Sequence, residues 1–393
     1  MKGKSMYIIY VGAFRFPKYD AAAARVLNNA RALIACGHSV EVISWGGQYE
    51  DPTKHFGDVA SYDGIDYTIT GELDGNNGLW AKIKNRLFRG AKTIEILTSK
   101  KRHIDLLISY NPELSFNIKL IRFAKTRGIK YANDITEWSD RNEHRLLEHL
   151  ADVINMKRTS HRVKNKIVIS SLLNNYYKSS NNLLVPPLCD LNEDKWRISQ
   201  EVEKENNSVT LIYAGNPARK DCLHIVINSV QNIIEEGGNF RLLIIGISKN
   251  DYTERYSDLL VTESLSDRIV FMGRLPQEQI PVYYRKSDFM VLMRDSTRKS
   301  MAGFPTKFVE SFAAGVPVIA NITSDLGAYL KDGETGFVVE KNTKEALIDV
   351  LKRVLKLDPG DIQRLKLNVK EESKRFDYHF HLDAFNEFIT NLH

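Results

Sequence analysis

The seventeen residues Phe304-Pro-Thr-Lys-Phe-Val-Glu-Ser-Phe-Ala-Ala-Gly-Val-Pro-Val-Ile-Ala320 predict a helix that leads into a buried strand. Pro305 suits the first turn of that helix, because its missing N–H group would be unpaired there anyway. Gly315 suits the helix end, and the apolar run 316–320 suits a strand covered on both faces. A helix that begins just past Gly303 offers free N–H groups and a positive dipole end to an anion such as phosphate.

The same alternation of strands and helices extends along the whole chain. A Gly/Pro loop is predicted for residues 12–19, followed by a helix capped by Asp20 and ended by Gly37. Alternating strands and helices imply parallel sheets covered on both faces, which place ligands at the carboxyl ends of their strands. The predicted strands are 7–11, 39–44, 104–109, 130–135, 167–171, 182–185, 209–213, 241–245, 269–272, 289–293 and 316–320.

Length and punctuation predict two domains. The chain has 393 residues, whereas a single hydrophobic core rarely grows past about 250–300. Pro186-Pro187 cannot continue a strand, and the polar stretch 192–208 follows them. We therefore expect α/β domains over residues 1–190 and 191–376, with a final helix in 377–393.

Composition excludes several classes of protein. The content of 43% hydrophobic and 26% charged residues is that of a globular protein. The three cysteines, Cys36, Cys189 and Cys222, are widely spaced, which argues against a disulfide framework or a zinc site and suits a reducing cytoplasm. No apolar run reaches the roughly 18–20 residues of a membrane span, and the short apolar start predicts a strand rather than a signal peptide.

The net charge of +6 is unevenly distributed. Residues 80–103 carry eight Lys/Arg and one acid, and residues 155–166 carry five Lys/Arg and no acid. One interpretation is a solvated helix face, and the other is attraction to anionic lipid headgroups. No helix-turn-helix, zinc finger or aromatic stacking motif accompanies the charge, so we do not expect a nucleic acid partner.

Five motifs follow one another in a recognisable order. They are Gly12 with Gly37-His-Ser-Val40; Tyr213-Ala-Gly-Asn-Pro-Ala-Arg-Lys-Asp221; Val270-Phe-Met-Gly-Arg274; Glu310-Ser-Phe-Ala-Ala-Gly-Val-Pro-Val-Ile319; and Asp332-Gly-Glu-Thr-Gly-Phe337. In these motifs the chain resembles the retaining, family-four glycosyltransferases of the GT-B fold, glycosyl transferases group 1, of the polysaccharide-biosynthesis type. The resemblance implies two Rossmann-like α/β domains facing across a cleft, with the acceptor bound by the first, the nucleotide-sugar donor bound by the second, and the C-terminal helix crossing back to the first.

The resemblance implies roles for individual residues. Glu310 would hold the nucleotide ribose, while Arg219 and Lys220 would stabilise the diphosphate as it leaves. The alternatives are an exposed helix acid for Glu310 and an exposed basic turn for Arg219 and Lys220. The other donor-binding positions that the resemblance implies are Gly12, Gly215, Asn216, Gly273, Arg274, Arg294, Arg298, Gly303, Phe304, Pro305, Thr306 and Lys307.

The chain departs from the family pattern on the donor side. A first glutamate is expected eight positions before Glu310, where this chain has Ala302. Backbone groups of residues 302–304, or Thr306, are expected to bind the sugar hydroxyls in its place. The arginine usual in the phosphate loop is replaced by Asn216, for which Arg219, Lys220, Arg294 and Arg298 are the expected substitutes.

The acceptor side departs as well. A histidine is frequent at one strand end in the family, and the matching stretch here is Ala132-Asn-Asp-Ile-Thr-Glu-Trp138. Asp134 and Glu137 are therefore expected to bind acceptor hydroxyls or to support a developing oxocarbenium ion. The alternative is an ordinary turn at the end of a strand.

The resemblance implies a retaining transfer of a sugar from a UDP or GDP type donor to a saccharide or lipid-linked acceptor in surface polysaccharide assembly. The chain has no Asp-x-Asp motif and no metal-ligand spacing, so no metal and no cofactor is expected. The expected location is the cytoplasm, peripheral at the inner face of the membrane. A sugar-nucleotide epimerase on the same fold and an inactive nucleotide-binding or scaffold paralogue stay open as alternatives, the second because of Ala302.

Overall fold

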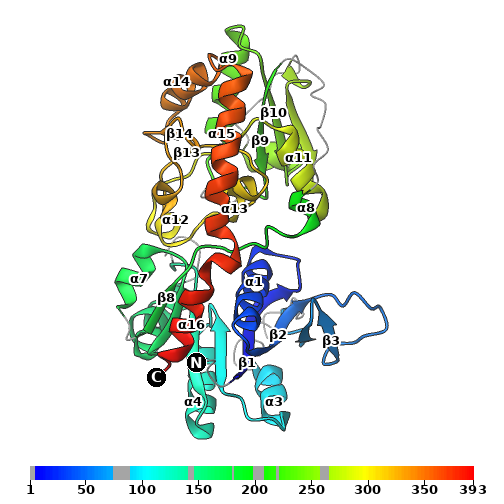
Figure 1. Ribbon diagram of the computed structural model, residues 1–393, viewed down its shortest axis with the longest axis vertical. Helices are drawn as coiled ribbons and strands as arrows, with labels where there is room; N and C mark the ends of the chain where they lie inside the picture. The colour runs from blue at the N-terminus through cyan, green and yellow to red at the C-terminus, as the bar shows by residue number, and fades with distance from the viewer. Residues whose placement is uncertain are drawn as a thin grey trace. The chain divides into compact units, whose positions relative to one another are not determined.

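The computed structural model describes residues 5–73, 89–139, 146–178, 181–197, 208–217, 221–256 and 265–393. The chain forms two compact units, whose elements are coloured by residue number in Figure 1. The N-terminal unit consists of Met1–Asp190 and Asp377–His393, and the C-terminal unit is Leu191–Phe376. Each unit is a sheet of parallel strands covered by helices, so the predicted fold class of two α/β units is confirmed.

The N-terminal unit is built on an eight-stranded sheet in the order β3-β4-β2-β1-β5-β6-β7-β8. All neighbouring pairs are parallel except β3 and β4, which form an antiparallel hairpin at one edge. The strands are β1 Tyr7–Phe16, β2 Ser39–Gly47, β3 Val59–Tyr62, β4 Ile65–Ile69, β5 Leu106–Tyr110, β6 Lys130–Ile135, β7 Asn165–Val168 and β8 Asn181–Leu184.

Helices cover both faces of this sheet because the buried side chains of its strands alternate between two cores. Ile8 and Tyr10 of β1 pack in the core that contains α1 and α16, while Ile9 and Val11 pack on the opposite face with α3 and α4. Figure 1 shows α16, in red, beside the blue α1 of the same unit. The helices are α1 Ala21–Ala35, α3 Ala91–Ser99, α4 Leu114–Arg127, α5 Leu146–Ile154, α6 Ser160–Arg162, α7 Ser171–Tyr177 and α16 Leu382–Thr390, with the π-helical turn η2 Asn155–Thr159 and the 3₁₀ turn η7 Tyr378–His381.

The C-terminal unit has a six-stranded, fully parallel sheet in the order β11-β10-β9-β12-β13-β14. Its strands are β9 Val209–Ala214, β10 Phe240–Ile245, β11 Ile269–Gly273, β12 Phe289–Leu292, β13 Val318–Asn321 and β14 Gly336–Val339. Its helices are α8 Asp194–Arg197, α9 Leu223–Glu235, α10 Lys249–Arg255, α11 Ile280–Lys286, α12 Arg298–Ala302, α13 Thr306–Ala313, α14 Lys344–Val354 and α15 Pro359–Glu372, with the 3₁₀ turns η4 Gln277–Gln279, η5 Leu326–Ala328 and η6 Ser373–Phe376.

Two local predictions need correction. Residues 12–16 were expected in a loop, but β1 continues to Phe16 across an irregularity in its pairing with β2. Pro305 was expected in the first turn of a helix, but it is the N-cap residue, and α13 begins at Thr306. The Asp20 cap is confirmed, since its carboxylate accepts a hydrogen bond from the backbone N–H of Ala23 at 2.7 Å.

None of the helices in the described ranges is long and apolar enough to cross a lipid bilayer.

Candidate functional site

Three neighbouring strands of the C-terminal sheet end in glycines with positive φ. They are Gly215 after β9, Gly246 after β10 and Gly273 at the end of β11. The N–H of Gly246 donates to the carbonyl of Gly273 at 2.7 Å, and a Cβ on Gly246 would lie 2.4 Å from the carbonyl carbon of Gly215. The close approach of the Gly215 and Gly246 backbones leaves no room for a Cβ at position 246, and the three glycines add no side chains of their own at the carboxyl edge of the sheet, where open α/β sheets bind ligands.

Gly215 and Gly273 were predicted from their motifs, whereas Gly246 was missed. The signal for it was present in the sequence, because Gly246 directly follows the apolar run of β10.

Helix α13 begins without a side-chain cap, because its N-cap residue is Pro305. Its first-turn N–H groups, at Thr306 and Lys307, are therefore open to a ligand. The Phe304 side chain is buried, so only its backbone can face a ligand. It packs in an aromatic cluster with Phe308, Tyr329 and Phe376, which fixes the chain direction at the start of α13.

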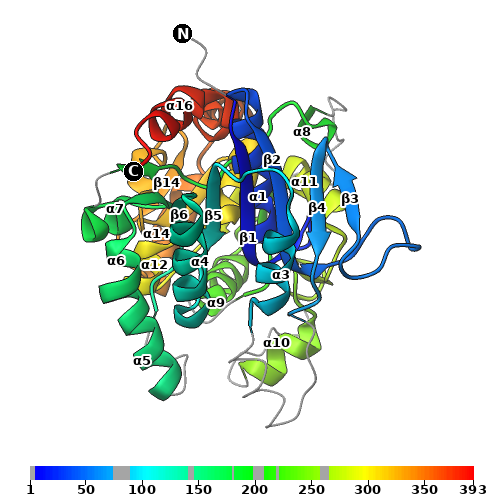
Figure 2. The ribbon, with the colours of Figure 1, turned by 90° about the horizontal axis from the view of Figure 1, so that it is seen from below.

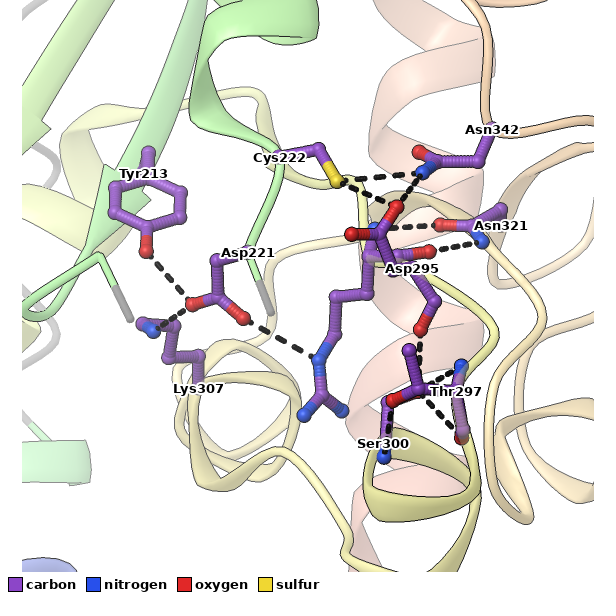
Figure 3. A network of polar contacts seen from close by, with 10 residues as sticks. Tyr213, Asp221, Cys222, Asp295, Thr297, Ser300, Lys307, Asn321 and Asn342 are labelled. Atoms are coloured by element: carbon purple, nitrogen blue, oxygen red, sulfur yellow. Dashed lines mark hydrogen bonds and ion pairs between the residues drawn. The ribbon is translucent and has the colours of Figure 1, made fainter. Parts of the chain in front are cut away.

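Asp221 is the centre of a polar network in front of β9 (Figure 3). Its Oδ2 accepts a hydrogen bond from the Tyr213 hydroxyl at 2.8 Å and lies 2.5 Å from Nζ of Lys307. The Lys307 ammonium lies 5.0 Å from the centre of the Tyr213 ring, and its aliphatic part passes over Gly215. Lys307 is thus held across the glycine turn by a carboxylate and an aromatic face.

Arg294, just after β12, approaches the other oxygen of Asp221. Its Nε lies 3.3 Å from Oδ1 of Asp221, and its backbone N–H and carbonyl form a reciprocal pair with the side chain of Asn321. The side chain is almost fully buried, and its Nη1 has no hydrogen-bond partner among the described residues. A buried guanidinium N–H without a partner is costly, so this group is suited to receive an anionic ligand.

Asp221, Lys307 and Arg294 together carry a net positive charge. Burial alone would raise the pKa of Asp221, but the nearby Lys307 and Arg294 hold it below its usual value. Asp221 is therefore ionised, and one of its two cationic partners remains uncompensated. Asp221 was not assigned a role from the sequence, although it follows directly on Arg219 and Lys220.

Glu310 lies one turn after Lys307 on α13. It is half-buried, and burial raises its pKa to about 7, although Lys307 and Lys195 act to lower it. Its carboxylate has no hydrogen bond or ion pair within the described part of the chain. A partly desolvated acid of this kind can accept hydrogen bonds from a pair of ligand hydroxyls.

The remaining donor positions are more exposed. Asn216 accepts a hydrogen bond from Arg255 at 3.3 Å. Arg274 points to solvent, and no hydrogen bond or ion pair of it falls inside the described ranges. Arg298 is the exposed first residue of α12, and Gly303 is half-buried between α12 and α13.

Arg219 and Lys220 lie outside the described residues, so their predicted contact with a diphosphate stays a prediction.

Asp134, predicted to face an acceptor, is instead buried in the N-terminal unit. Its side chain is fully inaccessible, and its oxygens bind Arg25, at 2.9 Å, together with the Tyr10 hydroxyl and Asn29. Arg25 also donates to the carbonyls of Val185 and Pro186. Every oxygen of Asp134 is thus used to join β1, α1 and β6, which corrects the expectation that it binds acceptor hydroxyls.

Glu137 and Gly12, the other two site residues predicted in the N-terminal unit, have surroundings different from those of Asp134. Glu137 is exposed just past β6, and its carboxylate adds to the burial that raises the pKa of Tyr110. Gly12 has a φ of 155°, and a Cβ there would lie 2.9 Å from the Tyr110 carbonyl oxygen. The packing of β1 against β5 is therefore sufficient to require a glycine at this position.

One group in the described residues brings three candidate metal ligands within 4.8 Å of one another: Asp190, Asp377 and His379. Asp377 caps the turn at Tyr378–His381 through the N–H of His379 and also bonds the His379 ring. These residues belong to the N-terminal unit, whereas Asp221 and Glu310 belong to the other.

Part of the chain is similar in sequence to known glycosyltransferases. Residues 194–375 match the family described as glycosyl transferases group 1. A capsular polysaccharide biosynthesis glycosyltransferase of Staphylococcus aureus is 23% identical over 277 residues, covering 64% of this chain and 63% of the relative. An amylovoran biosynthesis glycosyltransferase of Erwinia amylovora is 25% identical over 177 residues, covering 44% and 42%. Alignments to two further curated relatives span only 47% and 44% of their lengths.

Solved structures show the same fold over nearly the whole chain. Sucrose-phosphate synthase of Thermosynechococcus elongatus superposes with a TM-score of 0.73 at 17% identity, covering 98% of both chains. Anabaena HepE, solved in complex with UDP and glucose, gives a TM-score of 0.71 at 14% identity, covering 98% of this chain and 100% of HepE.

Proposed function

We propose that the chain transfers a sugar from a nucleoside-diphosphate donor to a saccharide or lipid-linked acceptor in surface polysaccharide assembly, because residues 194–375 match the family described as glycosyl transferases group 1. The names of the relatives support polysaccharide biosynthesis as the setting. The donor is proposed to be of the UDP or GDP type, and HepE with bound UDP and glucose supports UDP.

The observation that carries this proposal is the state of Glu310. A half-buried carboxylate with a pKa near 7, and with no partner in the described part of the chain, costs stability unless a ligand uses it. Two hydroxyls on adjacent carbons, as a ribose presents, would satisfy both of its oxygens. Its partial burial favours this use over the alternative of a solvated helix acid.

The diphosphate is proposed to lie over the glycine turn at Gly215, Gly246 and Gly273. The first turn of α13 supplies N–H groups there, and Lys307 and Arg294 supply positive charge. These groups would stabilise the charge that grows on the diphosphate as the sugar leaves. Arg219 and Lys220, which lie outside the described residues, are proposed from the family resemblance to add to this positive charge.

The remaining features are proposed from the family resemblance. They are retention of stereochemistry at the anomeric carbon, no requirement for a metal or cofactor, and binding of the acceptor by the N-terminal unit. Glu137, exposed after β6, is the better placed of the two predicted acceptor residues. A cytoplasmic location at the inner face of the membrane is proposed, and the three free thiols are consistent with a reducing compartment.

A panel of UDP-, GDP-, ADP- and CMP-sugars tests the function. We expect one donor to raise the melting temperature, since ligand at 100 times its Kd adds about 2.7 kcal/mol to stability. Nucleotide release from that donor should depend on an added saccharide or lipid-linked acceptor. No shift with any donor would overturn the proposal, and turnover to an epimerised sugar without acceptor would favour the epimerase instead.

A further inference from the structure

We propose that the helical segment 146–162 docks the N-terminal unit on an anionic lipid surface, with Leu150 and Ile154 entering the interface between headgroups and acyl chains. The segment consists of α5, η2 and α6, which follow one another without a break. This inference rests on the proposed function at one point: docking on a membrane would bring the enzyme to a lipid-linked acceptor.

The inner side of the segment is fixed against α4. The Asn117 amide of α4 donates to Oδ1 of Asn155 at 2.9 Å and to the Ser160 hydroxyl at 3.1 Å. The amide of Asn155 also donates to the carbonyl of Pro112 at 2.7 Å, and Met156 is buried beside it. Because this side is anchored in the unit, the opposite side faces away from α4, beside which Figure 2 shows α5.

The outward side, here called the docking face, consists of Leu150, Ile154, Lys157, Arg158 and Arg162. Leu150 and Ile154 are 47% and 45% exposed and stand one helical turn apart. Single exposed aliphatic residues are ordinary on protein surfaces. Two on one face, continued by cations along the same segment, form the pattern of a helix that lies in a membrane interface.

The charge that follows Ile154 along the segment is entirely positive, while the acid between the two aliphatic residues, Asp152, accepts a hydrogen bond from the Ser139 hydroxyl at 3.2 Å. Residues 153–166 contain no Asp or Glu, and Lys157, Arg158, Arg162 and Lys164 are exposed. Lys166 does not take part, since it is fully buried, and burial lowers its pKa to about 8. Four of the five cations predicted to meet a membrane from this stretch are therefore available.

The other basic stretch, 80–103, is a weaker candidate. Its residues 80–88 lie outside the described ranges. Most of its described cations are engaged within the unit: Arg89 with Glu113, Lys92 with the Thr70 carbonyl, Lys100 with Glu41, and Arg102 with the ring of Tyr7. Pairing with acids and carbonyls of the same unit reduces the attraction that these cations can offer to lipid.

The chemistry of the docking face favours lipid over a protein partner. A stable protein–protein interface buries roughly 800 Å² of accessible surface on each partner. Two aliphatic side chains bordered by cations offer a much smaller area. An anionic bilayer satisfies both features at once, because its headgroups attract the cations and its acyl region accepts the aliphatic groups.

Sedimentation with vesicles tests the proposal on the full chain. We expect binding to vesicles of phosphatidylglycerol and phosphatidylcholine, little binding to phosphatidylcholine alone, and weaker binding as salt rises. In K157Q/R158Q each neutralised cation should weaken binding about fivefold, which corresponds to about 1 kcal/mol. In L150S/I154S the loss should be at least about tenfold.

The matched control is L367S/K370Q on α15, which changes an exposed leucine and an exposed lysine of the other unit. It should bind vesicles as the parent does. No binding by the parent, or equal binding by all variants, would overturn the docking proposal. Concentration-dependent self-association of the parent without lipid, lost in L150S/I154S, would also overturn it in favour of a protein interface.

Donor-induced thermal shifts on the same proteins separate the two proposals. The docking variants should keep the parent's shift, because the docking face and Glu310 belong to different units. Vesicle binding without any donor shift would overturn the proposed function alone, and a donor shift without vesicle binding would overturn the docking alone.

Discussion

Glu310 and Asp134 are both carboxylates at positions where the sequence predicts a ligand, and their surroundings are opposite. Asp134 is fully buried, and Arg25, Tyr10 and Asn29 occupy its oxygens. Glu310 is half-buried beside two lysines and has no hydrogen bond in the described residues. The contacts of Asp134 stabilise the N-terminal unit, whereas the carboxylate of Glu310 remains able to accept hydrogen bonds from a ligand.

Replacing Glu310 by Gln should stabilise the protein at alkaline pH. The pKa of Glu310 is raised from 4.5 to about 7, so the folded chain binds more protons than the unfolded chain between these values. Its contribution to the free energy of unfolding therefore falls as the pH rises from 4.5 to 7 and stays low above 7. With allowance for partial exposure, Glu310→Gln should gain about 2 kcal/mol at pH 8 and little at pH 4.5.

Thermal melts of both proteins from pH 4.5 to 8 measure this difference. A variant that is equally stable at every pH, or less stable at pH 8, would show that Glu310 is satisfied within the fold.

Replacing Asp134 by Asn should have the opposite effect on stability. The change leaves the Arg25 guanidinium buried without a counter-ion, which typically costs about 3–5 kcal/mol. We expect the melting temperature to fall by about 10 °C, with any loss of activity following the loss of folded protein. Unchanged stability combined with a specific loss of acceptor affinity would contradict this structural role and would indicate that Asp134 binds the acceptor.

At the scale of elements, the glycine turns at the strand ends form part of the proposed donor site. Gly215→Ala would place a Cβ 2.4 Å from Cε of Lys307, on a backbone with φ of 124°. We expect this methyl group to displace Lys307 and to weaken donor binding about tenfold or more, since one charge-assisted contact contributes about 1.5–3 kcal/mol.

Gly128→Ala is the matched control. Gly128 caps α4 with a φ of 65°, and nothing lies within 4 Å of a Cβ there. This variant should lose about 1 kcal/mol of stability and keep the donor affinity of the parent. Equal affinity for donor in both variants, measured by titration, would contradict the proposal that Lys307 binds the diphosphate.

The sequence predicts elements well where their apolar pattern is strong. The strand predicted at 130–135 is β6 Lys130–Ile135, and the Asp20 cap starts α1 as expected. The hairpin of β3 and β4 was missed, because its strands are only four and five residues long and Val59 is exposed.

The candidate site is less predictable, because its contacts join distant positions. Lys307 and Asp221 are 86 positions apart, and Arg25 and Asp134 are 109 apart. Motifs could predict Glu310 and Lys307 as ligand positions. They could not show that Asp221 holds Lys307, or that Arg25 removes Asp134 from the surface, since only tertiary packing decides these pairings.

At the scale of the whole molecule, the proposed donor site belongs to one of the two units. All described groups of the proposed donor site, from Gly215 to Glu310, lie in Leu191–Phe376. The last segment of the chain belongs to the other unit, where Phe385 and Phe388 of α16 join the core with Leu33 and Leu183. The donor should therefore protect amides of β9, β10 and α13 from hydrogen exchange and leave those of α1 and α16 unchanged.

Calorimetric titration of UDP and GDP into the parent and into Glu310→Gln tests the central claim most directly. The control is Glu345→Gln, which changes an exposed acid of α14 in the same unit. We predict that the parent and Glu345→Gln bind one of the two nucleotides equally, and that Glu310→Gln binds it about 10- to 100-fold more weakly, as expected for the loss of hydrogen bonds to a charged group. Equal affinity in Glu310→Gln, or no binding of either nucleotide by the parent, would contradict the assignment of this unit as a nucleotide-sugar site.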